Sequence, residues 1–253
     1  MQFAALGSGS RGNATLVKSG KTCLMIDCGF SVKETEARLA KLGCDGQSIT
    51  ALLVTHEHSD HSKGVGAFAR KYDIPVWATR GTAADERFGK LSNLNKLNAE
   101  QLLELGDLNV QSYPVPHDAR EPCQFCFSDG NRRLAILTDA GSTTLHMEQL
   151  ISGCDALMLE CNHDHEMLWE GHYPQRLKER VAGQFGHLSN IQAAEFLKRI
   201  DISGLKQLVA MHLSEKNNTQ ALARYAISDA LDCEPDWIQF ADQDDGLDWQ
   251  KIS

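Results

Sequence analysis

The segment THEHSDHSKG, residues 55–64, crowds histidines and carboxylates in a way that is typical of a metal site. His56 and His58 are two residues apart at the end of an apolar strand pattern, so both side chains can point to one side. Asp60 and His61 follow where the chain is expected to turn toward a helix, and they approach from a second direction. A single histidine here would be read as part of a solvated polar turn, but ligand types and spacing together favour metal binding.

Three further candidate ligands follow apolar strand patterns elsewhere in the chain. His117 comes after YPVP, Asp139 after LAILT and His212 after QLVAM. Each alone is more often a satisfied polar residue than a ligand. Because sites in α/β sheets lie at the carboxyl ends of strands, we expect these residues to join the first cluster. The combined set exceeds the needs of one tetrahedral ion, so the sequence predicts two divalent ions.

Apolar runs that alternate with helical patterns predict the elements that position these residues. The expected strands cover residues 2–6, 14–17, 22–27, 51–55, 76–78, 108–115, 125–128, 133–138, 156–160 and 207–211. The expected helices cover residues 32–43, 65–72, 145–151, 190–200 and 219–231. Ser189 and Gln192 are placed as a capping box, and Gly43 ends the first helix. Residues 90–105 are expected to form a polar loop and a helix.

This order of elements indicates an α/β protein with two mixed β-sheets flanked by helices, an αββα four-layer sandwich. The net charge of -9 argues against a broad basic surface for non-specific nucleic-acid binding, but it permits an enzyme that holds one phosphate through metals. No charged-then-apolar leader and no apolar run of about 18 residues is present. We therefore expect a cytoplasmic protein that does not contact membranes, with free cysteines.

The glycine-rich segment GSGSRG, residues 7–12, matches the dinucleotide-binding fingerprint, and Asp27 follows at the expected distance. That fingerprint needs a helix directly after the glycines, and two strand patterns follow instead. We interpret the segment as a tight loop between strands. It is either a plain hairpin loop or one whose backbone NH groups face a pocket.

A second polar segment, ECNHDHEM, leaves several interpretations open. Its candidate residues are Glu160, His163, Asp164 and His165. Glu160 could orient a functional histidine from behind, the group could be a third ligand set, or the segment could be only a polar loop. In PCQFC, strand alternation sends Cys123 and Cys126 to opposite faces, so a zinc knuckle is not expected. Isolated basic residues that could meet a phosphate, or only solvent, are Arg11, Lys63 and Arg120.

The order H-x-H-x-D-H, then a separate His, Asp and His at successive strand ends, resembles the metallo-β-lactamase superfamily. TDAG around Asp139, GHLSNIQAAEFL from Gly186 and HLSEKNN from His212 resemble its nuclease-like branch, which includes ribonuclease Z. Over nearly its full length the chain is most similar to a short bacterial group of phosphodiesterase or 5′-to-3′ exonuclease type.

The resemblance implies a role for each matching position. One ion would be held by His56, His58 and His117, the other by Asp60, His61 and His212, and Asp139 would bridge them. The ions would be zinc or manganese, and a hydroxide bridging them would attack phosphorus. Asp60 and Asp139 would orient this nucleophile. His187 would donate a proton to the leaving oxygen or contact the phosphate, although a polar residue at a helix entry is the simpler alternative.

Departures from the larger members of the branch restrict the substrate. The intervals of 22 residues between His117 and Asp139, and of 73 between Asp139 and His212, are too short for a tRNA-gripping arm and an inserted cap domain. We therefore expect residues 1–253 to form a single catalytic domain that acts on single-stranded nucleic-acid ends or small phosphodiesters. The alternatives are an ester, thioester or lactone hydrolase on the same metals, and a non-catalytic metal-binding module that would have lost ligands.

Overall fold

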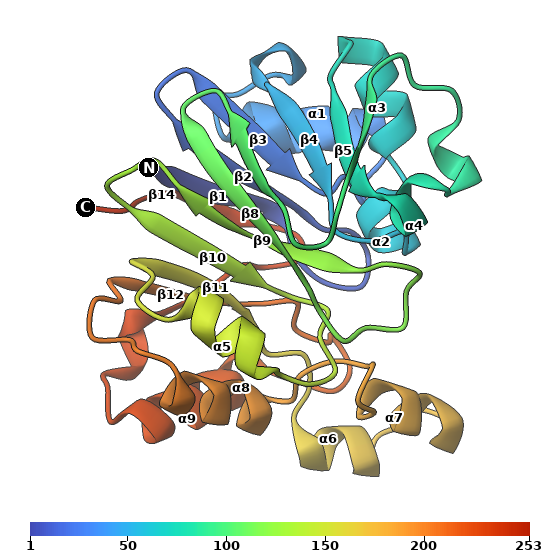
Figure 1. Ribbon diagram of the computed structural model, residues 1–253. Helices are drawn as coiled ribbons and strands as arrows, with labels where there is room; N and C mark the ends of the chain where they lie inside the picture. Colours follow the sequence, from blue (N-terminus) through green and yellow to red (C-terminus); the bar gives the residue numbers. More distant parts are fainter.

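Two seven-stranded mixed β-sheets pack face to face in the computed structural model, which describes residues 1–253 (Figure 1). The first sheet has the order β14-β1-β2-β3-β4-β5-β6. Its strands are β1 (Gln2–Gly7), β2 (Ala14–Ser19), β3 (Thr22–Ile26), β4 (Ala51–Val54), β5 (Val76–Thr79), β6 (Leu94–Leu97) and β14 (Leu247–Lys251). Pairing is antiparallel from β14 to β3 and parallel from β3 to β6.

The second sheet repeats this plan with the order β13-β12-β11-β10-β9-β8-β7. Its strands are β7 (Leu102–Leu105), β8 (Leu108–Pro114), β9 (Cys123–Ser128), β10 (Arg133–Leu137), β11 (Ala156–Glu160), β12 (Gln207–Met211) and β13 (Ile238–Phe240). Pairing is antiparallel from β7 to β10 and parallel from β10 to β13.

Helices cover the outer face of each sheet. Figure 1 shows α1 and α3 over the first sheet and α5, α8 and α9 over the second. The helices are α1 (Val32–Lys41), α2 (Ser59–Ser62), α3 (Val65–Tyr72), α4 (Arg80–Ala83), α5 (Leu145–Ile151), α6 (His165–Glu170), α7 (Gln175–Val181), α8 (Asn190–Arg199) and α9 (Gln220–Leu231). Short 3₁₀ turns occupy Gly46–Ser48, Glu86–Phe88 and Pro235–Trp237. The expected sandwich of two mixed sheets between helices is confirmed.

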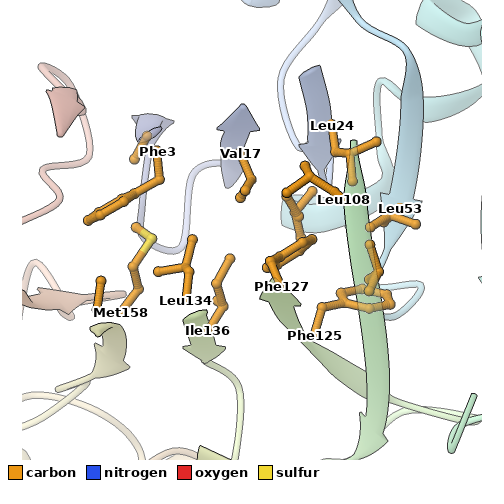
Figure 2. Packing of buried hydrophobic residues seen from close by; sticks show 14 of the residues in the cluster. Phe3, Val17, Leu24, Leu53, Leu108, Phe125, Phe127, Leu134, Ile136 and Met158 are labelled. Atoms are coloured by element: carbon orange, nitrogen blue, oxygen red, sulfur yellow. The ribbon is translucent and has the colours of Figure 1, made fainter. Parts of the chain in front are cut away.

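The central core lies between the two sheets. Figure 2 shows Phe3, Val17 and Leu24 of the first sheet facing Phe127 and Met158 of the second. Because successive strand residues point to opposite faces, their neighbours pack outward against the helices in two further apolar clusters. Strands buried on both faces read as continuous apolar runs, which is why the sequence revealed them. Each fully buried large side chain contributes about 1.5–3 kcal/mol to stability.

The loops that carry the candidate metal ligands all follow strands, and only His187 lies in a loop between two helices, α7 and α8. β3 and β4 are parallel, and so are β10, β11 and β12. β1 is joined to β3 through two successive antiparallel pairings, and β8 is joined to β10 in the same way. β1 therefore runs in the same direction as β3 and β4, and β8 runs in the same direction as β10, β11 and β12. A hydrogen bond from the Cys123 backbone NH to the Thr55 carbonyl, 3.0 Å, links the segment after β4 to the second sheet. The loops therefore converge over a shared edge of the sandwich.

The sequence located most elements within one or two residues, with one clear error. Helix α3 and helix α5 coincide with their predictions, and both hydrogen bonds of the Ser189–Gln192 capping box are present. Cys123 and Cys126 lie in different apolar clusters, as strand alternation predicted. The prediction of a loop and helix over residues 90–105 is wrong, because this segment forms β6 and β7. Pairing with β5 and β8 overrides the helical propensity of its Leu, Glu and Gln residues. No helix is long and apolar enough to cross a bilayer.

Candidate metal centre

The fold brings the seven predicted ligand residues into one cluster at the shared edge. His58 Nδ1 lies 3.2 Å from His117 Nε2, and the rings of His56 and His117 are 4.9 Å apart between centroids. Three sets, each spanning no more than 4.8 Å between ligand atoms, comprise His56, His58 and His117; Asp60, His61 and His212; and His56, His61 and Asp139. The first two sets are the two triads that the resemblance implied, and the third links them through Asp139.

Three residues whose side chains lie around the cluster have left-handed backbone conformations. Asp27, Asp139 and His212 have φ values of 62°, 53° and 54°, each just past the end of a strand. Such a φ costs energy for any residue with a Cβ atom and persists only when the surroundings enforce it. At His212, the backbone NH donates to Ser8 Oγ at 2.9 Å and the carbonyl accepts from Asn162 Nδ2 at 3.0 Å. The chain is thus bent sharply where a side chain must enter the site.

A close backbone contact fixes the loop that carries Asp60. The Asp60 carbonyl accepts a hydrogen bond from the Asn13 NH at 2.7 Å, and the Gly29 NH donates to the Asn13 carbonyl at 2.9 Å. A Cβ atom on Gly29 would lie 1.7 Å from the Asp60 carbonyl oxygen. Only glycine allows this approach, so Gly29 lets the segment after β3 pack against the ligand loop.

Asp27, which stands out in the sequence only as part of the dinucleotide fingerprint, contacts two histidines from behind the cluster, one directly and one through Thr55. Its carboxylate lies 2.8 Å from His61 Nδ1 and accepts from the Thr55 hydroxyl at 2.8 Å. The Thr55 oxygen lies 2.9 Å from His56 Nδ1. These partners place protons on the Nδ1 atoms and leave the Nε2 lone pairs of His56 and His61 for the centre of the cluster. An acidic residue directly after a buried strand was the signal available in the sequence.

Glu160 contacts two further histidines on the opposite side of the cluster, a geometry compatible with the orienting interpretation of ECNHDHEM. One oxygen lies 2.8 Å from His187 Nδ1 and 3.0 Å from His212 Nδ1. The other oxygen accepts from the backbone NH groups of Ala140 at 3.0 Å and Leu188 at 3.2 Å. The side chain is fully buried, and each of its two oxygens has two hydrogen-bond partners. Glu160 also lies within 4.8 Å of Asp139, His187 and His212, but its oxygens are already occupied by these four donors.

Two ring nitrogens at the centre have no hydrogen-bond partner. His56 Nε2 and His212 Nε2 are buried and unpaired. Unpaired polar atoms are rare in protein interiors because each costs about 1–3 kcal/mol. Imidazole nitrogens and carboxylates are also the donor set that zinc-like ions prefer. These residues therefore fit bound metal ions.

Charge coupling divides the histidines into two groups. Burial lowers the pKa of His56 well below its ordinary value, and it also lowers that of His117. Burial acts in the same direction on His61 and His212, but neighbouring carboxylates, Asp139 foremost, outweigh it. They raise the pKa of His61 well above its ordinary value and that of His212 to about 10. Without metal, His61 and His212 therefore hold extra protons that compensate the buried carboxylates.

The cluster forms the floor of an open pocket with a volume of about 330 Å³. No hydrophobic residue lines this pocket, which is bounded by Ser10, His58, Ser59, Asp60, Asp139, Arg180, His187 and His212. His187 stands at its wall with Nδ1 directed to Glu160, so its Nε2 is the ring nitrogen left for the pocket. Arg180 was missed in the sequence because nothing in its local pattern distinguishes it from other helix-surface arginines. Its Nε donates to Asp118 at 2.5 Å.

Several other polar candidates have different surroundings. The GSGSRG loop does not offer a row of NH groups to the pocket, because those of Gly9, Arg11 and Gly12 are hydrogen-bonded within the protein. The Arg11 side chain pairs with Glu215 and Asp244, and Arg120 lies 4.0 Å from Glu57. His163 is buried behind the site, and His165 begins α6. A third ligand set is therefore not formed by the histidines of ECNHDHEM.

Comparison with known proteins identifies the fold family. The family described as beta-lactamase superfamily domain matches residues 22–213. The chain is 38% identical to exodeoxyribonuclease YycJ of Bacillus anthracis over 236 residues, which cover 92% of this chain and 89% of the relative. The chain belongs to the metallo-β-lactamase superfamily. Exodeoxyribonuclease WalJ of Streptococcus pneumoniae is a further superfamily relative, 34% identical over 236 residues that cover 91% of this chain and 88% of that protein.

The superfamily fold is also found in solved structures of low sequence similarity. Zn²⁺-bound PqqB from Methylobacterium extorquens matches with a TM-score of 0.74 and 17% identity, covering 100% of both chains. This likeness shows the arrangement of sheets and helices. The resemblance inferred from the sequence motifs is therefore confirmed, and the protein is a hydrolase of the metallo-β-lactamase superfamily.

Proposed function

We propose that this protein is a binuclear metal-dependent phosphodiesterase that removes nucleotides from single-stranded nucleic-acid ends. The observation that carries the proposal is the convergence of seven imidazole and carboxylate groups beneath an open pocket without apolar lining. An apolar wall would suit an acyl or lactone substrate, whereas polar walls and an arginine suit a phosphodiester. The exodeoxyribonuclease relatives support nucleic acid as the substrate class.

In this proposal, the two triads hold one ion each and Asp139 lies between them. The first triad is His56, His58 and His117, and the second is Asp60, His61 and His212. Divalent ions, zinc or manganese, would act there as Lewis acids and lower the pKa of water so that a nucleophile is available at neutral pH. The unpaired nitrogens of His56 and His212 support these positions.

The chain's own groups then have distinct tasks. Asp60 borders the pocket beside the cluster, where its carboxylate can accept a proton from the attacking water and orient it. His187 reaches the pocket from the other side and can hold a proton at Nε2 for the leaving oxygen, while Glu160 fixes its ring. Arg180 keeps its terminal NH₂ groups for a phosphate oxygen, because Asp118 occupies only Nε.

The proposal includes a single catalytic domain over residues 1–253. Only β9 and β10 lie between His117 and Asp139, and the intervals on both sides of Asp139 support a core without an arm or cap. The net charge of -9 disfavours wrapping a long duplex, since such affinity rests on many phosphate contacts. Eight free cysteines support a reducing, cytoplasmic setting.

A matched pair of substrates tests the end-directed activity. Protein reloaded with zinc or manganese should cleave a linear single-stranded DNA much faster than the same strand closed into a circle. Equal rates on both would contradict the preference for ends. Hydrolysis of a thioester or lactone, with neither DNA cleaved, would favour the alternative hydrolase. Elemental analysis of the reloaded protein should give two ions per chain, and saturation at one would refute the binuclear arrangement.

A further inference from the structure

Phe185 is an exposed aromatic side chain on a backbone that is held in place. Its side chain is 59% exposed, although the segment around it is fixed by hydrogen bonds on both sides. The Phe185 carbonyl accepts from the Asp118 NH at 3.0 Å, and the Gln184 carbonyl accepts from Ser142 Oγ at 3.1 Å. The Gly186 NH donates to the Gly183 carbonyl at 2.9 Å. The ring is therefore presented to solvent by a rigid turn rather than by a loose loop.

The same turn is built into the wall of the candidate site. The Gly186 carbonyl lies 3.0 Å from Nδ1 of His117, and His187 follows directly. Asp118, which holds the Phe185 carbonyl, also binds Arg180 through its side chain and lies 3.6 Å from Nε2 of His117. A Cβ atom on Gly186 would lie 2.2 Å from backbone oxygens of α7, so the turn packs directly against the helix that carries Arg180, and the His187 NH donates to the Val181 carbonyl of that helix at 2.8 Å. The backbone of Phe185 is thus held against Asp118, the residue that binds Arg180, and lies two positions before His187 in the pocket wall.

We propose that Phe185 is a stacking platform for a base of the single-stranded substrate, next to the phosphate held at Arg180. The inference rests on the proposed nuclease function and adds a nucleobase subsite to it. Every base has a π face, so stacking on one phenyl ring gives affinity without reading sequence. Bases in a duplex are already stacked on one another, and a platform therefore favours unpaired ends. In a chain with a net charge of -9, stacking also supplies affinity that a basic surface would otherwise provide.

Binding and cleavage of two strands test the subsite. The first is a short fluorescent single-stranded DNA, and the second has the same backbone with abasic nucleotides at its ends. With Phe185→Ala, we expect binding of the natural strand to weaken roughly 10- to 100-fold, measured by anisotropy on the full chain in EDTA. With the metal-loaded enzyme, KM should rise by a similar factor while kcat stays within a few-fold. For the abasic strand, the binding affinity and the KM of Phe185→Ala should equal those of the unmodified protein.

Two matched variants complete the experiment. Phe185→Trp should restore binding of the natural strand, because indole also stacks. Tyr225 is a 69% exposed aromatic residue on α9 outside the site, so Tyr225→Ala should leave the binding affinity and KM for both strands unchanged. Equal binding of the natural strand by the unmodified protein and Phe185→Ala would overturn the stacking role, as would equal losses on both strands. The proposed nuclease function fails separately, if the metal-loaded unmodified protein cleaves no phosphodiester.

Discussion

Replacing Glu160 with glutamine tests whether the buried carboxylate orients the site. In the protein, one Glu160 oxygen meets His187 and His212, and the other meets two backbone NH groups. Glutamine has the same shape but carries an NH₂ group in place of one oxygen. Whichever way the amide turns, that group faces two donors. Two of the four hydrogen bonds are then lost, either at the histidines or at the backbone.

The expected loss of stability can be worked out in two ways. Hydrogen bonds to a charged group contribute about 1.5–3 kcal/mol each, so two lost bonds cost about 3–6 kcal/mol. Independently, although burial opposes ionisation, contacts with His187 and His212 lower the pKa of Glu160 from 4.5 to about 2. At about 1.4 kcal/mol per pKa unit, the ionised carboxylate contributes about 3 kcal/mol above pH 4.5. For a chain of this length that corresponds to a melting temperature lower by roughly 6–12 °C.

Thermal unfolding of the metal-free protein measures this effect. The difference in melting temperature between the unmodified protein and Glu160→Gln should be largest at neutral pH. It should narrow as the pH falls from 4.5 toward 2, since a carboxylate with a lowered pKa loses its contribution on protonation. Zinc affinity should also fall by about 10- to 100-fold. Glu104→Gln on the exposed side of β7 is the matched control and should leave both values unchanged. Identical melting curves for Glu160→Gln and the unmodified protein at pH 7 would refute the reasoning.

Other substitutions and conditions separate the remaining roles. His58→Ala should lose metal and activity together, whereas His187→Ala should retain metal and lose rate by roughly 10²–10⁴-fold; equal metal loss in both, by elemental analysis, would contradict the role of His187. Because the pKa values of His61 and His212 are both raised, metal binding at their triad must release two protons, and zinc affinity there should rise about hundredfold per pH unit near neutrality. Calorimetry in two buffers of different ionisation enthalpy measures this release, and its absence would argue against His212 as a ligand. Gly29→Ala should destabilise the protein by about 1–3 kcal/mol or more, because its Cβ would meet the backbone. Gly204→Ala, with open space around it, is the control, and equal denaturant midpoints for the two would show that the close contact is not needed.

The sequence alone determined the local elements and the types of candidate ligand. Apolar runs revealed the strands because parallel strands are buried on both faces, and polar residues just past those runs marked the site. The dense spacing of His56, His58, Asp60 and His61 carried most of this information, since few other functions need those residue types together. Where the local signal was weak, it misled. Residues 90–105 have helical propensity, but β5 and β8 offer edges that pair with them.

Only the tertiary structure decided which distant residues serve the cluster and how each ring is turned. Asp27 is 34 positions from His61, and Glu160 is 52 positions from His212, yet both pairs are in hydrogen-bond contact. No sequence period links such residues, because strand order and loop direction bring them together. Arg180 and Phe185 were inconspicuous for the same reason: an arginine and a phenylalanine acquire a role only from what stands beside them. The left-handed turns at Asp27, Asp139 and His212 likewise depend on neighbours that hold the backbone, which the local sequence does not specify.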